Sequence, residues 1–143
     1  MSTERIIVQR AIIDEFRVAL KSAINEIYGD HNPAPTLINS AGVEKNKNLV
    51  KDAAEKGAVV AAGDVDAPAT SEVKMRPIVV EGVTEEMDIF HAESFGPTVS
   101  LIVVDSDEEA LKVANNSEYG LSTAIFTENL GRGLKIAREL ETG

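Results

Sequence analysis

The sequence predicts an α/β fold in which helices connect the strands of one sheet. Short runs of β-branched residues alternate with longer segments whose apolar residues recur every three or four positions. In chain order, these patterns predict a strand, two helices, three strands, a helix, a strand and a final helix. Helices placed between strands are typical of crossover connections in an α/β domain. The 143 residues suit a single domain with one core.

The first two elements are a strand and an amphipathic helix. The β-branched run at residues 5–9 predicts a strand buried in a sheet. The helix is expected over residues 11–28, and Gly29 is placed to end it. Its apolar face contains Ile12, Ile13, Phe16, Leu20, Ala23, Ile24 and Ile27. Two prolines then indicate a loop over residues 30–39.

A second, more polar helix is expected over residues 41–56. Ser40 can cap its first amides, and Gly57 can close it. Its narrower apolar face contains Val43, Val50 and Ala53.

Apolar runs predict the remaining strands. Residues 58–61 and 78–80 form two short runs, separated by a loop of small residues over 63–71. Residues 98–104 are the most apolar stretch of the chain, and their β-branched content favours a central strand. A last short strand is expected over residues 123–127.

Two helices complete the pattern. Ser106 and Glu109 match a capping box, which starts a helix that leaves through a turn at residues 115–120. The final helix has an apolar stripe of Leu130, Leu134, Ala137 and Leu140.

Composition excludes several classes of function. A net charge of −10 without any run of Lys or Arg disfavours nucleic acid and anionic membranes as partners. No apolar run approaches the roughly 20 residues needed to span a bilayer, and residues 1–5 lack a signal-peptide layout. These features predict a soluble, cytoplasmic protein. His31 and His91 have no ligand partners at suitable spacing, so no metal site is expected.

The absence of cysteine excludes further kinds of site. The chain contains none, which rules out disulfides, thiolate zinc sites and a cysteine nucleophile within these 143 residues.

The segment Glu93-Ser94-Phe95-Gly96-Pro97 is the most informative motif for function. In one interpretation Gly96 and Pro97 form a turn, Phe95 belongs to the core and Glu93 is solvated. In the other, the Glu93 carboxylate accepts hydrogen bonds from the vicinal hydroxyls of a ribose, and an exposed Phe95 flanks a planar ring.

An ordered set of segments around this motif resembles the aldehyde dehydrogenase superfamily. The set comprises residues 93–97, 107–111, 114–115, 119–122 and 125–127, and similar segments occur at 4–8, 51–58 and 75–80. The resemblance therefore covers nearly the whole chain. Within the superfamily, residues 34–37, 46–48 and 75–77 resemble the salicylaldehyde and vanillin dehydrogenase branch.

The resemblance implies a three-layer, open, mostly parallel sheet that forms part of a catalytic domain. Residues 1–143 are expected to lack the cofactor-binding domain and the end of the catalytic domain. The implied enzyme oxidises an aromatic aldehyde, such as salicylaldehyde or vanillin, to its carboxylate with NAD or NADP. Apolar edges left by missing strands would favour self-association, so we expect a homo-oligomer.

The resemblance also assigns roles to two residues. Glu93 would hold the nicotinamide ribose hydroxyls, and Phe95 would pack near the nicotinamide. The family's cysteine nucleophile would lie directly before Met1, and its general-base glutamate is absent as well. No catalytic residue is therefore expected in this chain, and the isolated chain is expected to be inactive. The alternative is an orphaned, non-catalytic α/β module that serves in binding or assembly.

Overall fold

The computed structural model describes residues 3–67 and 71–143. They form a four-stranded sheet in the order β1-β4-β3-β2. The strands are β1 (Arg5–Gln9), β2 (Val59–Ala62), β3 (Ile78–Glu81) and β4 (Thr98–Val104). The inner strand β4 is parallel to both β1 and β3, whereas β2 is antiparallel to β3. The prediction of a mostly parallel sheet with residues 98–104 in its interior is confirmed.

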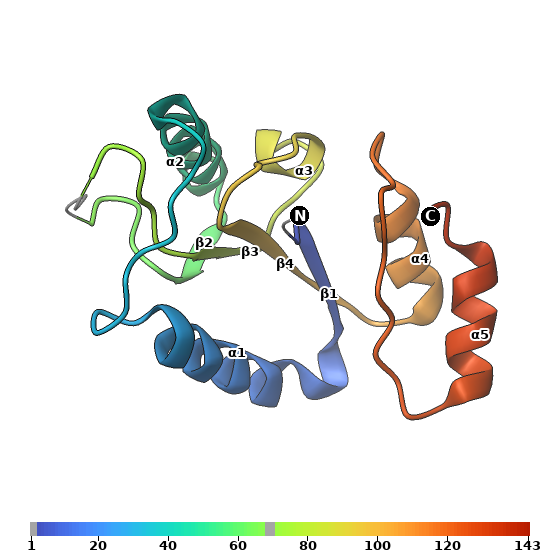
Figure 1. Cartoon of the computed structure of the whole chain (residues 1–143). Helices are drawn as coiled ribbons and strands as arrows, with labels where there is room; N and C mark the ends of the chain where they lie inside the picture. The colour runs from blue at the N-terminus through green and yellow to red at the C-terminus, as the bar shows by residue number, and fades with distance from the viewer. Residues whose placement is uncertain (1–2, 68–70) are drawn as a thin grey trace.

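Helices cover both faces of this sheet, which confirms the three-layer prediction. Figure 1 shows α1 on one face and α2 with α3 on the other, while α4 and α5 lie beyond the β1 edge. The helices are α1 (Ile13–Tyr28), α2 (Ser40–Glu55), α3 (Asp88–His91), α4 (Asp107–Asn115) and α5 (Leu130–Glu139), and a 3-10 turn, η1 (Arg10–Ile12), precedes α1.

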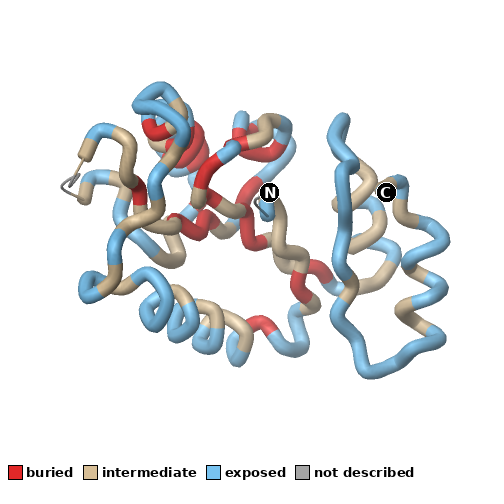
Figure 2. Tube along the Cα trace, viewed as in Figure 1, coloured by how far each residue is buried: buried red, intermediate tan, exposed pale blue. Residues whose placement is uncertain are grey.

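The core consists of one apolar cluster on each side of the sheet. Successive strand residues point to opposite faces, so Ile78 and Val80 pack toward α2 and α3 while Val79 packs toward α1. In Figure 2 the buried residues concentrate in the sheet, α2 and α3, whereas the α5 end of the chain is mostly exposed. The sheet with α2 and α3 is therefore the best-packed part of the molecule.

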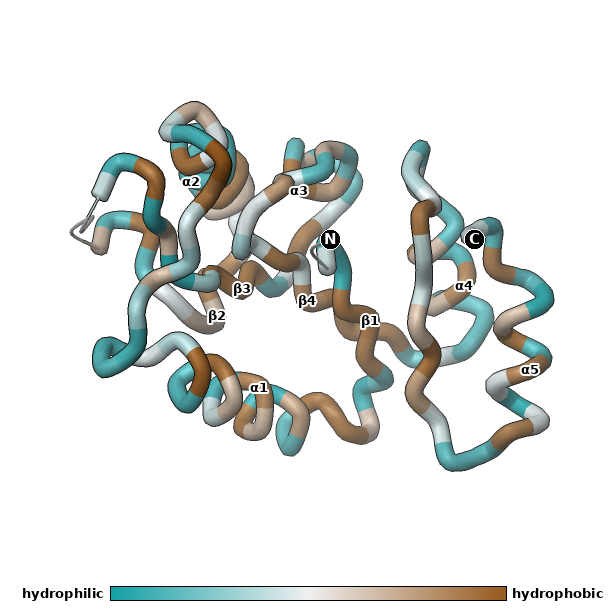
Figure 3. The backbone as a smooth tube through the Cα atoms, in the orientation of Figure 1, coloured by the Kyte–Doolittle hydropathy of each residue, from teal (hydrophilic) through white to brown (hydrophobic). Residues whose placement is uncertain are grey.

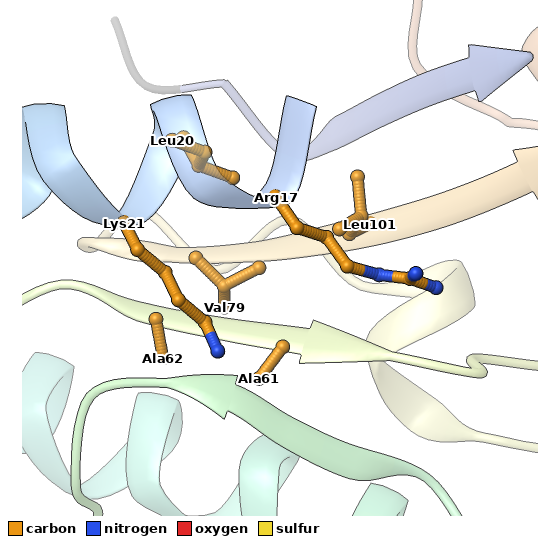
Figure 4. Close-up of a pocket in the computed structure, with 7 residues that line it drawn as sticks. All are labelled: Arg17, Leu20, Lys21, Ala61, Ala62, Val79 and Leu101. Atoms are coloured by element: carbon orange, nitrogen blue, oxygen red, sulfur yellow. The ribbon is translucent and has the colours of Figure 1, made fainter. Parts of the chain in front are cut away.

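A small void separates α1 from the sheet. Figure 4 shows the stems of Arg17 and Lys21 extending from α1 over Ala61 and Val79. The void has a volume of about 10 Å³ and an apolar lining, which is at most the space of a single water molecule. It is a packing gap between helix and sheet with no room for a ligand.

The cap of α2 differs from the prediction. Asn39, and not Ser40, precedes the helix, and its Oδ1 accepts a hydrogen bond of 2.9 Å from the Gly42 amide. Ser40 is already the first helical residue. Asn and Ser are comparable N-cap residues, so the local sequence does not decide whether Asn39 or Ser40 caps the helix. Gly57 does follow the end of the helix, with a φ of +100° that favours glycine.

The capping prediction for α4 is confirmed in its first half. Ser106 Oγ accepts a hydrogen bond of 3.1 Å from the Glu109 amide. The Glu109 carboxylate, however, accepts from the Asp105 amide at 2.7 Å, one residue before the position that the capping box predicts.

The strand predicted at residues 123–127 does not form. The segment has no ladder with any strand of the described residues. Composition indicates an extended backbone, but a strand also needs a neighbour with which to exchange hydrogen bonds, and local sequence carries no information about that neighbour.

No helix within residues 3–67 and 71–143 combines the length and the apolar character needed to cross a bilayer.

Candidate functional site

The segment 93–97 lies at the edge of the sheet where the parallel strands begin. Arg5 of β1 pairs with Ser100 of β4, so the residues that precede these two strands lie side by side. The Ile78 amide at the start of β3 donates to the Pro97 carbonyl at 2.9 Å. The parallel register thus brings Glu4 next to a segment about 90 residues away in sequence.

Within the segment, buried and exposed residues alternate sharply. Ser94 and Gly96 are buried, whereas Phe95 between them is 75% exposed. The Gly96 amide donates to Ser94 Oγ at 3.2 Å. Phe95 has a φ of 51°, in the left-handed region that few non-glycine residues adopt. The interpretation of Phe95 as a core side chain is therefore wrong, because this backbone turn directs its ring outward.

Glu4 contacts the segment from the β1 side. Its Oε2 accepts a hydrogen bond from the Ser94 amide at 3.0 Å, and its Oε1 accepts one from the Phe95 amide at 3.3 Å. Two consecutive backbone donors therefore point at one carboxylate.

Helix α2 contacts the segment from the other side. Asn46 is fully buried, and its Nδ2 donates to the Ser94 carbonyl at 3.0 Å. Lys45 Nζ donates to the Glu93 carbonyl at 2.6 Å and lies 5.8 Å from the centroid of the Phe95 ring. The second distance is within the range of a cation–π interaction.

The Glu93 side chain remains available to a ligand. Glu93 is half-buried, and its carboxylate makes no hydrogen bond with any of the described residues. A carboxylate of this kind can accept two hydrogen bonds from vicinal hydroxyls, and the exposed Phe95 ring two residues later can flank a planar ring.

Arg5 holds the elements around this site together. Its Nη1 donates to the carbonyls of Val113 and Asn116 at 2.8 and 2.9 Å, and its Nη2 donates to the Phe90 carbonyl. The guanidinium also stacks 4.2 Å above the centroid of the Phe90 ring. Burial lowers the pKa of Arg5 from its ordinary value, without removing its charge at neutral pH. One side chain thus joins β1 to α3 and to the end of α4.

The site has no nucleophile of the kind that sequence resemblance implies. The chain contains no cysteine. The described residues also include no cluster of three or more His, Asp or Glu side chains that could hold a metal ion. His91 instead pairs through Nε2 with the Glu85 carbonyl at 2.7 Å.

Sequence reasoning proposed Glu93 and Phe95 as cofactor contacts but did not single out the residues that hold their segment. The sequence could have indicated that Asn46 is buried, because it falls at helical spacing between Val43 and Val50 on an otherwise apolar face. Nothing in the local sequence indicates the role of Glu4, since its contact with residues 94 and 95 depends on the pairing of β1 with β4.

One family of known proteins resembles this chain along its whole length. The model of the aldehyde dehydrogenase family matches residues 1–143. A vanillin dehydrogenase from Pseudomonas sp. (strain HR199 / DSM 7063) is 38% identical over 149 residues, covering 100% of this chain and 30% of that protein. The chain therefore spans about a third of the length of its relatives.

Two solved structures have the same fold as this chain. The succinate-semialdehyde dehydrogenase from Burkholderia pseudomallei superposes with a TM-score of 0.89 at 31% identity, over 99% of this chain and 30% of that one. The succinic semialdehyde dehydrogenase from Streptococcus pyogenes, in complex with NADP+ as the cofactor, gives a TM-score of 0.85 at 30% identity, over 97% and 31% of the two chains.

Proposed function

The chain belongs to the aldehyde dehydrogenase family, whose members are oxidoreductases acting on aldehydes, and from this premise we propose that it holds the nicotinamide end of NAD or NADP. The complete enzyme would oxidise an aromatic aldehyde, of the salicylaldehyde or vanillin type, to the carboxylate. The aldehyde would be its small-molecule partner.

One observation carries this proposal. The Glu93 carboxylate has no hydrogen bond to the described residues, and the Phe95 ring two positions later is 75% exposed. An unsatisfied acceptor beside an exposed aromatic ring at a strand edge supports contact with a ribose and the planar ring attached to it.

The residues of this chain would bind and orient the reactants. The cofactor, when bound, supplies the group that accepts hydride from the aldehyde. Glu93 would accept hydrogen bonds from the ribose hydroxyls, and Phe95 would limit the position of the nicotinamide. Because the chain contains no cysteine, a covalent step on a thiol requires a residue outside these 143 positions. We therefore expect the isolated chain to form no NADH from an aldehyde.

The aromatic preference is the finer part of the proposal. It is supported by the 38% identity to a vanillin dehydrogenase. The choice of NAD or NADP depends on residues that contact the far end of the cofactor. A homo-oligomeric state and a cytoplasmic location remain predictions from the sequence.

A segment exchange tests the proposal. Residues 1–143 replace the matched segment of the Pseudomonas vanillin dehydrogenase, and NADH formation from vanillin is measured. We expect activity, and we expect Glu93→Ala to weaken cofactor binding about tenfold or more, since a hydrogen bond to a charged group contributes roughly 1.5 to 3 kcal/mol. Glu128→Ala, an exposed acid before α5, is the matched control.

The competing function is a non-catalytic binding or assembly module, which the absence of cysteine favours. A folded exchange protein that forms no NADH, beside an active parent enzyme, would support this alternative. A Glu93→Ala protein that keeps its hydride-transfer rate and cofactor affinity would instead remove the assigned role of Glu93.

A further inference from the structure

We propose that Glu4 and Asn46 are positioning residues that hold the backbone of residues 94–96 from two sides, in the conformation that presents Glu93 and Phe95. We call this pair the Glu4–Asn46 clamp. The proposal rests on the function proposed above, since it concerns how the same site is held, but its geometry can be tested without the cofactor.

The Glu4 side of the clamp binds two consecutive amides. Its two carboxylate oxygens accept separately from Ser94 at 3.0 Å and from Phe95 at 3.3 Å. The backbone of Glu4 is itself held, because its carbonyl accepts from the Ser100 amide at 2.9 Å, directly before the β1–β4 ladder begins. Glu4 is therefore fixed to β4, the strand that follows directly after the segment bound by its carboxylate.

The Asn46 side of the clamp combines a hydrogen bond with a close packing contact. Asn46 Nδ2 donates to the Ser94 carbonyl at 3.0 Å and to the Gly42 carbonyl of its own helix at 2.9 Å. A Cβ atom on Gly96 would lie 2.3 Å from the same Nδ2, a separation that real side chains do not reach. Gly96 is therefore required for the Asn46 amide to approach this backbone.

The conformation of Phe95 explains why the segment needs support on both sides. Its φ of 51° is unfavourable for a residue with a Cβ atom. Such a conformation persists when the surrounding contacts determine it, and Ser94 and Gly96 provide those contacts on either side. Without the clamp, we expect Phe95 to relax and its ring to lose its defined position relative to Glu93.

The first test uses nuclear magnetic resonance of the 143-residue chain. Glu4→Gln keeps the shape of the side chain and removes its charge, with Glu128→Gln as the control. We expect the Ser94 and Phe95 amide protons to move upfield and to exchange about tenfold or more faster, because each loses a charge-assisted hydrogen bond. The amides of Val79 and Leu101 in the core should not change.

The second test addresses Asn46 and has a control on the same helix. Asn46→Ala should increase the exchange of residues 94–96, whereas Asn48→Ala, on the exposed side of α2, should not. Gly96→Ala should displace the Phe95 resonances strongly in the natural chain, and less strongly in the Asn46→Ala background, where the added methyl group has space.

A measurement on the unsubstituted chain tests the clamp even if the variants fail to fold. Nuclear Overhauser contacts are expected from the Glu4 side chain to the Ser94 and Phe95 amides. Their absence, or unchanged Ser94 and Phe95 amides in Glu4→Gln, overturns the clamp. If the clamp signals appear while Glu93→Ala leaves the exchange protein fully active, the clamp stands and the function proposed for the site fails.

Discussion

At the scale of single residues, Arg5 makes the largest set of long-range contacts near the site. It donates to three backbone carbonyls from two other elements and the turn after α4, and stacks on Phe90. Arg10, five residues later, forms an exposed ion pair with Asp105. Comparing the two arginines therefore distinguishes the stability contributed by a partly buried hydrogen-bond network from that contributed by a surface ion pair.

This contrast leads to a prediction of stability. Arg5→Met should lower the free energy of unfolding by about 2 kcal/mol or more, because three carbonyls lose a charged donor. Arg10→Met should have a much smaller effect, since both partners of its ion pair are more than half exposed. Urea unfolding of the two variants measures the difference, and equal losses would contradict the role given to Arg5.

The site also shows what residue-level reasoning can and cannot reach. A carboxylate two positions before an aromatic residue is visible in the sequence, so Glu93 and Phe95 could be proposed as ligand contacts. Whether Phe95 is exposed could not be decided, because its left-handed backbone depends on Glu4 and Asn46, which are distant in sequence.

At the scale of elements, α5 is attached to the remainder of the chain largely through polar contacts with α4. Arg132 Nε donates to Asp107 Oδ2 at 2.7 Å, and Asn115 Nδ2 donates to the Glu139 carbonyl at 2.8 Å. Leu130 and Leu134 on the predicted apolar stripe are 75% and 52% exposed. The periodicity correctly predicted a helix, but not that its stripe would be exposed in this chain.

The attachment of α5 should depend on pH. The hydrogen bond from Arg132 holds the pKa of Asp107 below its usual range. The unfolded-state pKa of Asp is about 3.9, so this stabilisation is complete above about pH 4 and is lost as the pH falls through the lower folded-state pKa. Acidification below about pH 4 should therefore loosen α5.

Asp107→Asn tests this linkage. At pH 6 we expect faster amide exchange in α5 than in the natural chain, and we expect the difference to shrink as the pH falls below about 4. Glu108→Gln, an exposed acid in the same first turn of α4, is the control. Asp52 and Asp105 also have lowered pKa values, but they are present in both proteins and cancel from the comparison. A constant difference across this pH range would exclude the Asp107–Arg132 pair as its source.

At the scale of the whole molecule, apolar surface is distributed unevenly. In Figure 3 the strands are mostly brown, as expected for a core, but brown segments also occur on α5 and on the extended chain before it. Leu121, Phe126 and Leu130 are 75%, 94% and 75% exposed. Large apolar side chains exposed in this way are typical of surfaces that another chain or segment covers.

We therefore predict self-association of the isolated chain through this region. Light scattering should show particles larger than a monomer, and Phe126→Ser combined with Leu130→Ser should reduce their size, because less apolar surface is removed from water on association. Ile38→Ser, at a 95% exposed residue in the loop before α2, is the control. A monomeric natural chain would contradict the prediction.

The sequence by itself determined the α/β class, most element bounds, the Ser106 cap of α4 and the candidate pair Glu93 and Phe95. These follow from local preferences and periodicity, which act over a few residues. Only the tertiary structure decided the sheet order, the failure of residues 123–127 to pair, and the junction of Glu4 and Asn46 at residues 94–96. The physical reason is that strand pairing joins residues far apart in the chain, and local composition does not encode which distant backbone donors and acceptors will meet.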